Sequence, residues 1–361
     1  MTEHEDRRWM EYALRLGRRH LGLTWPNPSV GCVVVKNNRL VGMGVTAPGG
    51  RPHAEPQALA MAGRDAVGAT AYVTLEPCAH YGQTPPCAET LRDAGIARVV
   101  IALEDPDPRV NGGGRAILEA AGISVSMGMC RGEAERDQVG YLKRLRNGRP
   151  FVTLKLAQSL DGRVALASGE SKWITGAEAR RTGHGFRANH DAILVGHGTL
   201  TADQPQLTSR LPGLQTRSPI RVIASSDGAC NIDTMVEDAG PPIWIMQTAP
   251  KDGFRDAGPV QRERVPATDD GRINLHAMME RLASLGITRL YCEGGPTLGT
   301  SLLKEDLVDQ IVLFSAPMAI GGDGRPTIAE LGLGALDQAP AFSFRSHRHV
   351  GDDVLSVLER A

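Results

Sequence analysis

Three short stretches of the chain carry residues whose types and spacing could hold a metal ion and activate water. They read His53-Ala54-Glu55, Pro77-Cys78 and Pro85-Pro86-Cys87. Zinc favours cysteine sulfur and histidine nitrogen, and a catalytic zinc site keeps three protein ligands and leaves one position for water. His53, Cys78 and Cys87 supply three such ligands, and Glu55 supplies a carboxylate that can accept the proton of that water.

The residue types and their order agree with the signature of zinc-dependent deaminases, in which a His-x-Glu triplet precedes a Pro-Cys pair and a second cysteine. In such a site the glutamate is not a ligand: it takes a proton from water and returns it to the departing nitrogen, so that ammonia leaves. Here residues 79–86 separate the two cysteines, a longer interval than in the short signature. Two alternatives stay open, namely a structural zinc site with His80 as a fourth ligand, and no metal.

The elements that position these side chains follow from the local sequence. Because His53 and Glu55 are two positions apart, they do not share one face of a regular helix. Both reach a single site only where a helix begins, and the neighbouring Pro52 and Pro56 agree with a helix start at this point. We therefore predict a helix over 53–61. A second helix over 87–94 would place Cys87 at its start, where backbone N–H groups and the helix dipole favour a thiolate.

Alternating strands and helices around these stretches predict a three-layer α/β domain over residues 1–147. Its other predicted elements are the helices 6–21, 115–121 and 133–146 and the strands 31–36, 39–45, 71–75, 98–103 and 124–127. Asn147-Gly148-Arg149-Pro150 breaks the helical pattern, and we place the domain boundary there. Residues 148–361 then form a second α/β domain, with strands predicted over 151–157, 192–195, 221–224, 243–246, 289–292 and 310–314, helices over 177–187, 275–285 and 297–303, and one or two closing strands within 346–358.

Composition limits the class of protein. The chain has 361 residues, 41% of them hydrophobic, which suits two folded domains. Lys and Arg total 40 and Asp and Glu total 41, so no basic surface for nucleic acid or acidic membranes is indicated. The charged N-terminus and the lack of a long apolar run argue against a signal peptide or a membrane helix. We expect a cytoplasmic protein that binds neither nucleic acid nor membrane.

One family matches the first domain. Val73-Thr74-Leu75-Glu76-Pro77-Cys78-Ala79-His80, with Gly82 and Thr84-Pro85-Pro86-Cys87, resembles the deaminase half of the RibD family of bifunctional riboflavin-biosynthesis deaminase/reductases, as does Pro26-Asn27-Pro28-Ser29-Val30-Gly31. The long interval between the cysteines is characteristic of that family, and Pro56-Gln57 is a local difference from it. The resemblance implies a cytidine-deaminase-like fold, one catalytic Zn²⁺ per chain, and contacts of Asn27 and His80 with the pyrimidine or the ribose phosphate.

The second domain contains a glycine-rich stretch between a predicted strand and a predicted helix, Glu293-Gly294-Gly295-Pro296-Thr297-Leu298-Gly299-Thr300. Glycines there expose backbone N–H groups, and a helix start favours anions, so a phosphate-bearing ligand is expected. No G-x-G-x-x-G follows a strand, so a Rossmann site is not indicated. This stretch resembles the reductase half of the same family, together with residues 154–157, 159–162, 168–171 and 173–175, Arg187, Thr199, Asp203, Pro205, Leu207, Thr208 and Arg210.

That resemblance implies a dihydrofolate-reductase-like fold that uses NADPH. The implied cofactor contacts are Ala157, Trp173, Thr199, Asp203, Ser226, Gly294, Gly295, Pro296, Thr297, Leu298, Gly299 and Thr300. The implied substrate contacts are Ser171, Arg187, Leu207, Arg210 and Glu293. Guanidinium groups bind phosphate bidentately, so Arg187 and Arg210 suit a ribose phosphate. The general acid of the reduction stays open among Lys155, Asp161 and Glu293.

The leading hypothesis is a bifunctional enzyme of riboflavin biosynthesis. Its first domain would remove the 2-amino group of 2,5-diamino-6-ribosylamino-4(3H)-pyrimidinone 5′-phosphate, and its second would reduce the ribosyl group to ribityl with NADPH. We also expect a homo-oligomer, a dimer or a tetramer. The alternatives are a deaminase of nucleic acid or free nucleobases with an appended domain, and a second domain that serves only interaction or dimerisation.

Overall fold

The computed structural model describes residues 2–236, 240–249 and 260–361. The chain divides into two compact units, unit 1 (Met1–Gly148) and unit 2 (Arg149–Ala361). The division falls in the Asn147–Pro150 stretch, where Gly148 adopts a left-handed conformation with φ of 65°. Glycine takes such a conformation without the steric cost that a Cβ atom would add.

Unit 1 is built on a five-stranded sheet with the order β2-β1-β3-β4-β5. The β1–β2 hairpin and the β1–β3 pair are antiparallel, whereas β3, β4 and β5 run parallel. The strands are β1 (Gly31–Lys36), β2 (Arg39–Val45), β3 (Thr70–Val73), β4 (Arg98–Ile101) and β5 (Ser124–Met127). Buried β-branched residues such as Val33 and Val99 fill its centre, because they pack well on a pleated surface.

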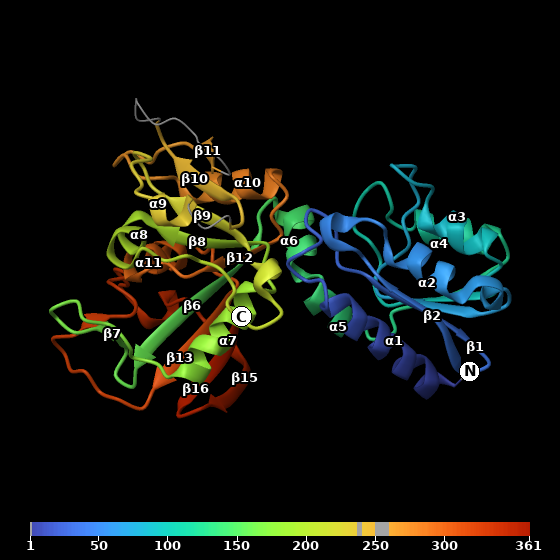
Figure 1. Ribbon diagram of the computed structural model, residues 1–361, viewed down its shortest axis with the longest axis horizontal. Coiled ribbons are helices and arrows are strands. Elements are labelled where there is room, and N and C mark those ends of the chain that lie inside the picture. The colour runs from blue at the N-terminus through green and yellow to red at the C-terminus, as the bar shows by residue number, and fades with distance from the viewer. Residues whose placement is uncertain (1, 237–239, 250–259) are drawn as a thin grey trace. The chain divides into compact units, whose positions relative to one another are not determined.

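Helices cover both faces of this sheet, so the predicted three-layer arrangement is confirmed (Figure 1). They are α1 (Glu3–Arg18), α2 (Ala54–Ala62), α3 (Cys87–Asp93), α4 (Gly113–Ala120), α5 (Arg131–Asp137) and α6 (Val139–Asn147). The single helix predicted over 133–146 is wrong, since Gln138 separates α5 from α6. The buried Gln138 side chain donates to the Ser29 carbonyl, a tertiary contact that no local pattern reveals.

Unit 2 contains a nine-stranded sheet with the order β11-β10-β9-β8-β12-β6-β13-β16-β15. The strands from β11 to β13 are parallel, and β16 and β15 complete the sheet in antiparallel pairs. The strands are β6 (Phe151–Ser159), β8 (Ala192–Gly196), β9 (Ile220–Ala224), β10 (Ile243–Gln247), β11 (Val260–Arg264), β12 (Arg289–Cys292), β13 (Gln310–Ala316), β15 (Phe342–Val350) and β16 (Asp353–Arg360), with a separate pair β7 (Arg163–Ala165) and β14 (Arg325–Pro326).

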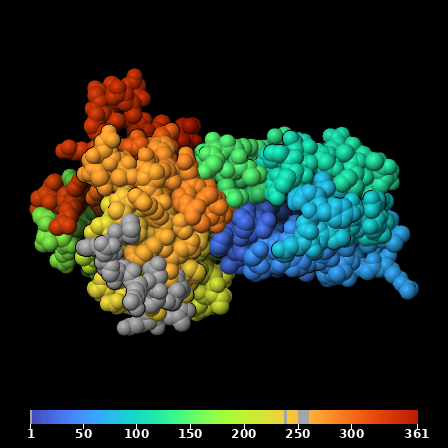
Figure 2. Space-filling model, turned by 90° about the horizontal axis from the view of Figure 1, so that it is seen from above, coloured from blue at the N-terminus to red at the C-terminus, as the bar shows by residue number. Residues whose placement is uncertain are grey.

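The unit 2 helices are α7 (Ala177–Arg187), α8 (His197–Asp203), α9 (Asp233–Val236), α10 (Leu275–Ser284) and α11 (Pro296–Lys304). Successive residues of a strand point to opposite faces, and this places α7 and α11 on different sides of β6. Thr153 contacts His190, which follows α7, whereas Leu154 lies under Gly299 of α11. The predicted closing hairpin of β15 and β16 is confirmed, and β15 is its exposed strand; the red C-terminal part of the chain lies at the surface of unit 2 (Figure 2).

No helix among the described residues is long and apolar enough to cross a membrane.

Candidate active sites

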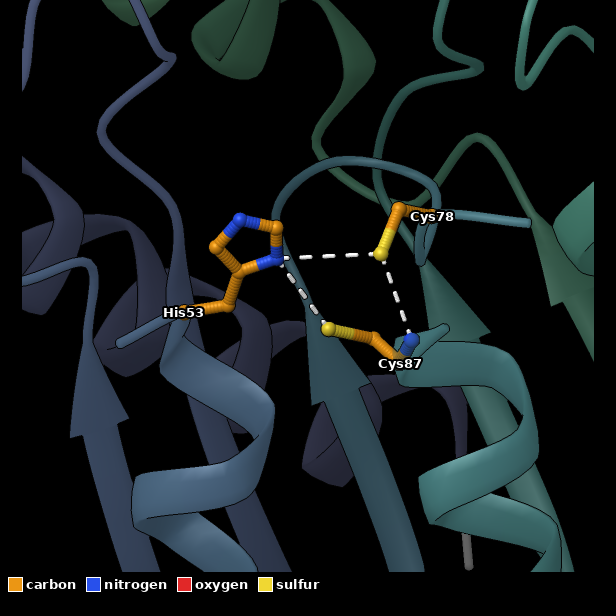
Figure 3. A group of neighbouring side chains, drawn as sticks. All are labelled: His53, Cys78 and Cys87. Atoms are coloured by element: carbon orange, nitrogen blue, oxygen red, sulfur yellow. Dashed lines mark hydrogen bonds between the residues drawn. The ribbon is translucent and has the colours of Figure 1, made fainter. Parts of the chain in front are cut away.

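Three elements of unit 1 bring the predicted metal ligands together (Figure 3). His53 is the N-cap of α2 and has an extended backbone. Cys78 lies in the loop that follows β3, and Cys87 is the first residue of α3, directly after Pro86. Proline is favoured at helix starts because its ring fixes φ and it has no N–H to satisfy. The helix starts that the sequence predicted at His53 and Cys87 are confirmed to within one residue.

The ligand atoms converge on one point. His53 Nδ1 lies 3.2 Å from Cys87 Sγ and 3.7 Å from Cys78 Sγ, and the Cys87 backbone N–H donates to Cys78 Sγ over 3.2 Å. The three ligand atoms all lie within 4.8 Å of one another. This nitrogen and sulfur set matches what zinc prefers, and Nδ1 is the ring nitrogen that faces the sulfurs. Within the described chain His80 does not join the group, which argues against the four-ligand structural site.

The thiols of this group have unequal acidity. A hydrogen bond from Cys87 and the neighbouring His53 lower the pKa of Cys78 to about 4. The same contact with Cys78, together with burial, raises the pKa of Cys87 far above its usual value. Cys78 is thus the more acidic thiol of the pair.

Glu55 lies in the first turn of α2 and is only 3% exposed. Burial raises the pKa of its carboxyl group to about 7, and the charge of Cys78 acts in the same direction. A carboxyl group with a pKa near the working pH can both accept and return a proton. The structure thus puts a proton carrier beside the three ligand atoms.

Gln57 ties the ligand-bearing turn to the sheet. Its Nε2 donates to the carbonyl oxygens of His53 and Val45, over 2.8 and 2.5 Å. The backbone of β2 can come this close because Gly44 has no Cβ, and a Cβ there would lie 2.1 Å from the Ala54 carbonyl oxygen. Pro56-Gln57, the local difference from the family pattern, therefore leaves the ligands in place. Gln57 also adds a hydrogen bond that holds the His53 backbone.

Glu76 secures the strand end that carries Cys78. Its buried carboxylate accepts the backbone N–H groups of Asp105, Gly112 and Arg115, over 3.3, 3.1 and 3.0 Å. These donors belong to the loop after β4 and to the start of α4, where N–H groups lack partners inside the helix. One carboxylate thus joins three segments immediately beside the Cys78 ligand.

The loop between the cysteines is held at two points. Arg51 Nη1 donates to Thr84 Oγ1 over 3.0 Å, and the Tyr81 hydroxyl donates to Glu89 of α3 over 2.7 Å. The long interval between the cysteines is thereby an ordered part of the site.

Sequence reasoning missed an acidic pair in the loop after β4. Asp105 and Asp107 are 5% and 4% exposed. Asp105 accepts from the Tyr141 hydroxyl over 3.0 Å, and burial raises its pKa to about 6. Asp107 pairs with Arg109. The signal in the sequence was Asp105-Pro106-Asp107-Pro108, which follows β4 after a few residues. Because β4 runs parallel to β3, the two strands end at the same edge of the sheet, where β3 leads to Cys78.

The two predicted substrate residues of unit 1 lie in different surroundings. His80 is half-buried, and its Nδ1 is a buried atom without a hydrogen-bond partner among the described residues. Asn27 is half-buried against Gly50, where a Cβ would lie 2.0 Å from the Asn27 amide nitrogen. Gly50 has a φ of 85°, so both its conformation and its contact with Asn27 require glycine.

In unit 2 most of the predicted cofactor residues lie at the carboxyl edge of the parallel strands. Ala157 belongs to the end of β6, Thr199 to α8 after β8, and Ser226 follows β9. Gly294 to Thr300 follow β12, and the Gly295 backbone N–H donates to Thr199 Oγ1 over 3.0 Å. Ligands of open α/β sheets bind in the crevice outside this edge. The structure thus gathers residues that are far apart in the sequence.

The loop that carries Ser171 and Trp173 reaches α8. Lys172 lies 3.6 Å from Asp203, and the exposed Trp173 ring has the Arg180 guanidinium 4.6 Å from its centre. The Lys172–Asp203 ion pair therefore brings the loop that carries Ser171 and Trp173 to Asp203. Leu207 is 1% exposed and belongs to the core, so its side chain packs inside the protein.

Arg187 and Glu293 form an ion pair from α7 to the end of β12. Arg187 Nε and Nη2 donate to the two carboxylate oxygens of Glu293, over 2.6 and 2.9 Å. Burial acts to raise the pKa of Glu293, but the charge and the hydrogen bonds of Arg187, together with the charges of Lys155 and His184, lower the pKa to about 2. Arg210, in contrast, is exposed.

A second group of possible ligands in unit 1 comprises Glu11, Cys130 and Glu133. Glu133 pairs with Arg18, and Arg7 Nη1 lies 4.0 Å from Cys130 Sγ. These cations already neutralise the group, and we assign no metal to it.

Comparisons with known proteins match each unit to a family of known domains. Residues 3–103 match the cytidine and deoxycytidylate deaminase zinc-binding region, and residues 150–356 match the RibD C-terminal domain. The riboflavin biosynthesis protein RibD of Escherichia coli is 42% identical over 97% of this chain and 98% of its own length.

Two solved structures are similar over almost the whole chain. RibD of Acinetobacter baumannii has a TM-score of 0.88 at 37% identity and covers 100% of both chains. The diaminohydroxyphosphoribosylaminopyrimidine deaminase/5-amino-6-(5-phosphoribosylamino)uracil reductase of Thermotoga maritima has a TM-score of 0.87 at 30% identity and covers 99% of both. The zinc-binding deaminase region of this chain thus contains the His53, Cys78 and Cys87 group. The chain belongs to the RibD family of riboflavin-biosynthesis enzymes, which combine a deaminase and a reductase.

Proposed function

We propose that unit 1 hydrolyses the 2-amino group of 2,5-diamino-6-ribosylamino-4(3H)-pyrimidinone 5′-phosphate, and that unit 2 then reduces the ribosyl group of the product to ribityl with NADPH. The observation that carries the first half is the convergence of His53, Cys78 and Cys87 beside the buried Glu55. The full-length likeness to the Thermotoga deaminase/reductase supports the order of the two activities.

The donor set of unit 1 fits zinc, with His53 Nδ1, Cys78 Sγ and Cys87 Sγ as ligands. Bound there, Zn²⁺ lowers the pKa of water toward about 7 and so supplies a nucleophile. Glu55 takes the proton of the attacking water and returns it to the leaving amine, and one water and one amino group thereby become a carbonyl group and ammonia.

Asn27 and His80 are proposed to contact the pyrimidine or its ribose phosphate. The orphaned Nδ1 of His80 supports this role, because a buried polar atom without a partner is costly unless a ligand completes it. The amide of Asn27 offers both a donor and acceptors, which suits the edge of a pyrimidine ring.

NADPH is proposed to bind along the carboxyl edge of the unit 2 sheet and to supply hydride. The residues proposed to hold it are Ala157, Trp173, Thr199, Asp203, Ser226 and Gly294 to Thr300. The start of α11 after Gly295 supports a site for its phosphates, since the dipole at the N-terminus of a helix favours anions. Ser171, Arg187, Arg210 and Glu293 are proposed to line the substrate side, with Leu207 contributing only its backbone or its packing there.

Among the three candidates for the general acid, we propose Lys155. Asp161 accepts from Ser159 Oγ and from the Ile320 and Gly321 backbone N–H groups, which lowers its pKa and keeps it a carboxylate. Glu293 is held as a carboxylate by Arg187. Lys155, half-buried on β6, is near enough to Glu293 to act on its charge.

A coupled assay with the diaminopyrimidine phosphate tests the proposal. Ammonia and NADPH are followed separately, and we expect ammonia release without NADPH, and NADPH oxidation only after deamination. A deaminase of free nucleobases would instead release ammonia from cytosine or guanine, and a second unit that serves only interaction would leave NADPH unconsumed. A cytoplasmic location and a dimer or tetramer stay predictions, to be checked by cell fractionation and light scattering.

A further inference from the structure

The ends of β8 and β9 are joined by polar side chains at the carboxyl edge of the unit 2 sheet. His197 is the first residue of α8, directly after β8, and Ser225 directly follows β9. His197 Nδ1 lies 3.4 Å from Ser225 Oγ, and Ser225 Oγ donates to Asp227 Oδ1 over 3.1 Å. Ser225 is buried, whereas His197 and Asp227 are exposed. An imidazole and a carboxylate thus lie close together, near the proposed cofactor residues Thr199 and Ser226.

We propose that His197 selects the phosphorylated form of the cofactor: its imidazole binds the phosphate on the 2′-oxygen of the adenosine ribose, so that unit 2 takes NADPH in preference to NADH. The inference rests on the proposed function, which puts a nicotinamide dinucleotide along this edge of the sheet.

The strand order locates the adenosine end of the dinucleotide. The strands in this part of the sheet follow the order β9, β8, β12 and β6. The proposed substrate contact Glu293 follows β12, and the proposed general acid Lys155 lies on β6, so the nicotinamide ring has to lie there for hydride transfer. Three strand spacings span about 14 Å, which suits an elongated cofactor. Its adenosine end therefore reaches the ends of β8 and β9.

The first residues of α8 contact both neighbours of β8. Thr199 Oγ1 accepts from the Gly295 backbone N–H over 3.0 Å, on the side of β12. His197, two residues earlier, contacts Ser225 on the side of β9. Gly295 belongs to the turn proposed to hold the phosphates that join the two nucleotides. His197 therefore lies beyond that turn, toward the adenosine.

The His197 ring has donors to offer an anion. Thr201 Oγ1 lies 3.3 Å from Nε2 and donates its own proton to the His197 carbonyl over 3.0 Å. Ser225 gives its proton to Asp227, so both hydroxyl oxygens beside the ring can accept from it. A charged imidazolium donates from both nitrogens. Among the described residues the ring contacts these two hydroxyls and no carboxylate, so a phosphate meets no competing anion on the ring.

Asp227 represents the opposite preference. In dinucleotide sites of the Rossmann type, a carboxylate near the adenosine accepts the ribose 2′-hydroxyl group and so favours the cofactor without the phosphate. Asp227 Oδ1 already accepts from Ser225 Oγ and from the Ala229 backbone N–H, over 3.1 and 3.0 Å. These bonds close the turn after β9 and hold the carboxylate beside its own loop. The geometry thus gives Asp227 to the turn and leaves His197 for the cofactor.

Binding of the two cofactors tests this assignment without the chemical step. The dissociation constants of NADPH and NADH are measured by the fluorescence of the reduced nicotinamide ring, in the whole chain and in its variants. His197→Ala should raise the Kd of NADPH by about tenfold or more and leave that of NADH unchanged, since a hydrogen bond to a charged group contributes that much. His197→Arg should keep or lower the Kd of NADPH, because a guanidinium donates to phosphate.

Asp227→Asn separates the two candidate groups. It should lower the Kd of NADPH by about two- to fivefold, the size of the effect of an exposed charge pair, and leave the Kd of NADH unchanged. Weaker binding of NADH in this variant would show that Asp227 contacts the ribose, and it would overturn the proposal. An equal loss of both cofactors in His197→Ala, or an unaltered Kd of NADPH, would overturn it as well.

His276→Ala is the matched control, because His276 is exposed on α10 and pairs with Glu305. Both dissociation constants should stay unchanged in it. Cooperative unfolding by urea and ammonia release by unit 1 report that each variant is folded. If His197→Ala proves unstable, His197→Arg decides: a retained preference for NADPH supports the proposal, and a lost preference contradicts it.

Failure of the proposed function gives a different result. A whole chain that binds neither cofactor refutes reduction by unit 2, and this inference with it. A whole chain that binds NADPH and NADH equally well leaves reduction intact and overturns only the role of His197.

Discussion

At the residue scale, the chemistry proposed for unit 1 depends on one carboxyl group in unusual surroundings. Glu55 is buried beside two sulfurs and an imidazole, and burial brings its pKa to about 7. A solvent-exposed glutamate would be a weaker base at neutral pH. The helix start at α2 is what lets residues two positions apart serve one site.

Glu55→Gln should stop deamination and leave the zinc bound, because the amide keeps the shape of the side chain but cannot carry the proton. General acid–base groups contribute about 10²–10⁴-fold, and a loss of at least that size in ammonia release is expected. NADPH oxidation with the deaminated substrate should persist. The exposed Glu119→Gln on α4 is the control, and simultaneous loss of both activities would contradict separate sites.

Cys87→Ala should abolish zinc retention, since two ligands remain of a three-ligand set. Metal analysis after dialysis should give about one zinc per unchanged chain and close to none for the variant. Cys230→Ala, at a buried cysteine of unit 2, should keep its zinc. Full metal content in the Cys87 variant would mean that the ligands are assigned incorrectly.

Asp105 makes stability depend on pH in unit 1. Burial raises its pKa from 3.8 to about 6, so the folded chain prefers the protonated form. A carboxyl group with a raised pKa favours folding at low pH. The free energy of unfolding should therefore fall by roughly 3 kcal/mol as pH rises from about 4 to 6. Asp105→Asn should lack this loss. Urea unfolding at pH 4.5 and pH 8 measures this difference between the two proteins. A variant with the same pH dependence as the unchanged chain would contradict the prediction.

At the element scale, the ligand-bearing loop after β3 depends on close packing with α4. A Cβ on Gly114 would lie 2.0 Å from the Pro77 carbonyl oxygen, next to the Cys78 ligand. Glu76 adds three backbone hydrogen bonds around the same point. The start of a helix thus determines the position of a zinc ligand on a different segment.

Gly114→Ala should destabilise unit 1 by about 1–3 kcal/mol and weaken zinc retention, because the backbone at Pro77 has to move. Gly132→Ala on α5 is the matched control: its Cβ would meet a flexible arginine end at 3.5 Å, and the gain in helix propensity should leave it neutral or slightly stabilised. Chemical unfolding and competition with a chelator measure both effects. Equal behaviour of the two variants would contradict the proposed contact.

At the scale of the whole molecule, each unit has its own sheet, its own buried core and its own proposed site. The division follows Gly148, in a short break and not within an element. Such units can fold alone when few of their interactions cross the boundary.

Separate expression of residues 1–148 and 149–361 should therefore give two folded proteins with one activity each. Ammonia release from the diaminopyrimidine phosphate is expected from the first and NADPH oxidation with the deaminated product from the second. Circular dichroism and cooperative unfolding serve as the folding controls. A folded second fragment that neither binds nor oxidises NADPH would favour a purely structural role for unit 2.

The sequence by itself determined the chemistry and most of the elements. Ligand types, proline punctuation and the His-x-Glu triplet are local features, and so are the helix over 177–187 and the strands over 124–127 and 289–292, which the structure has at the predicted bounds. Periodicity and capping act over a few residues, which is why a single sequence reveals them.

Only the tertiary structure decided which distant groups meet. Arg187 and Glu293 are 106 residues apart in the chain, and their ion pair forms only in the folded molecule. Glu76 binds N–H groups up to 39 residues further along the chain, and Gln138 interrupts a helix through a contact with Ser29. Such contacts depend on the order of strands in each sheet and on which faces the helices cover. Those are properties of the packed molecule, and no local pattern specifies them.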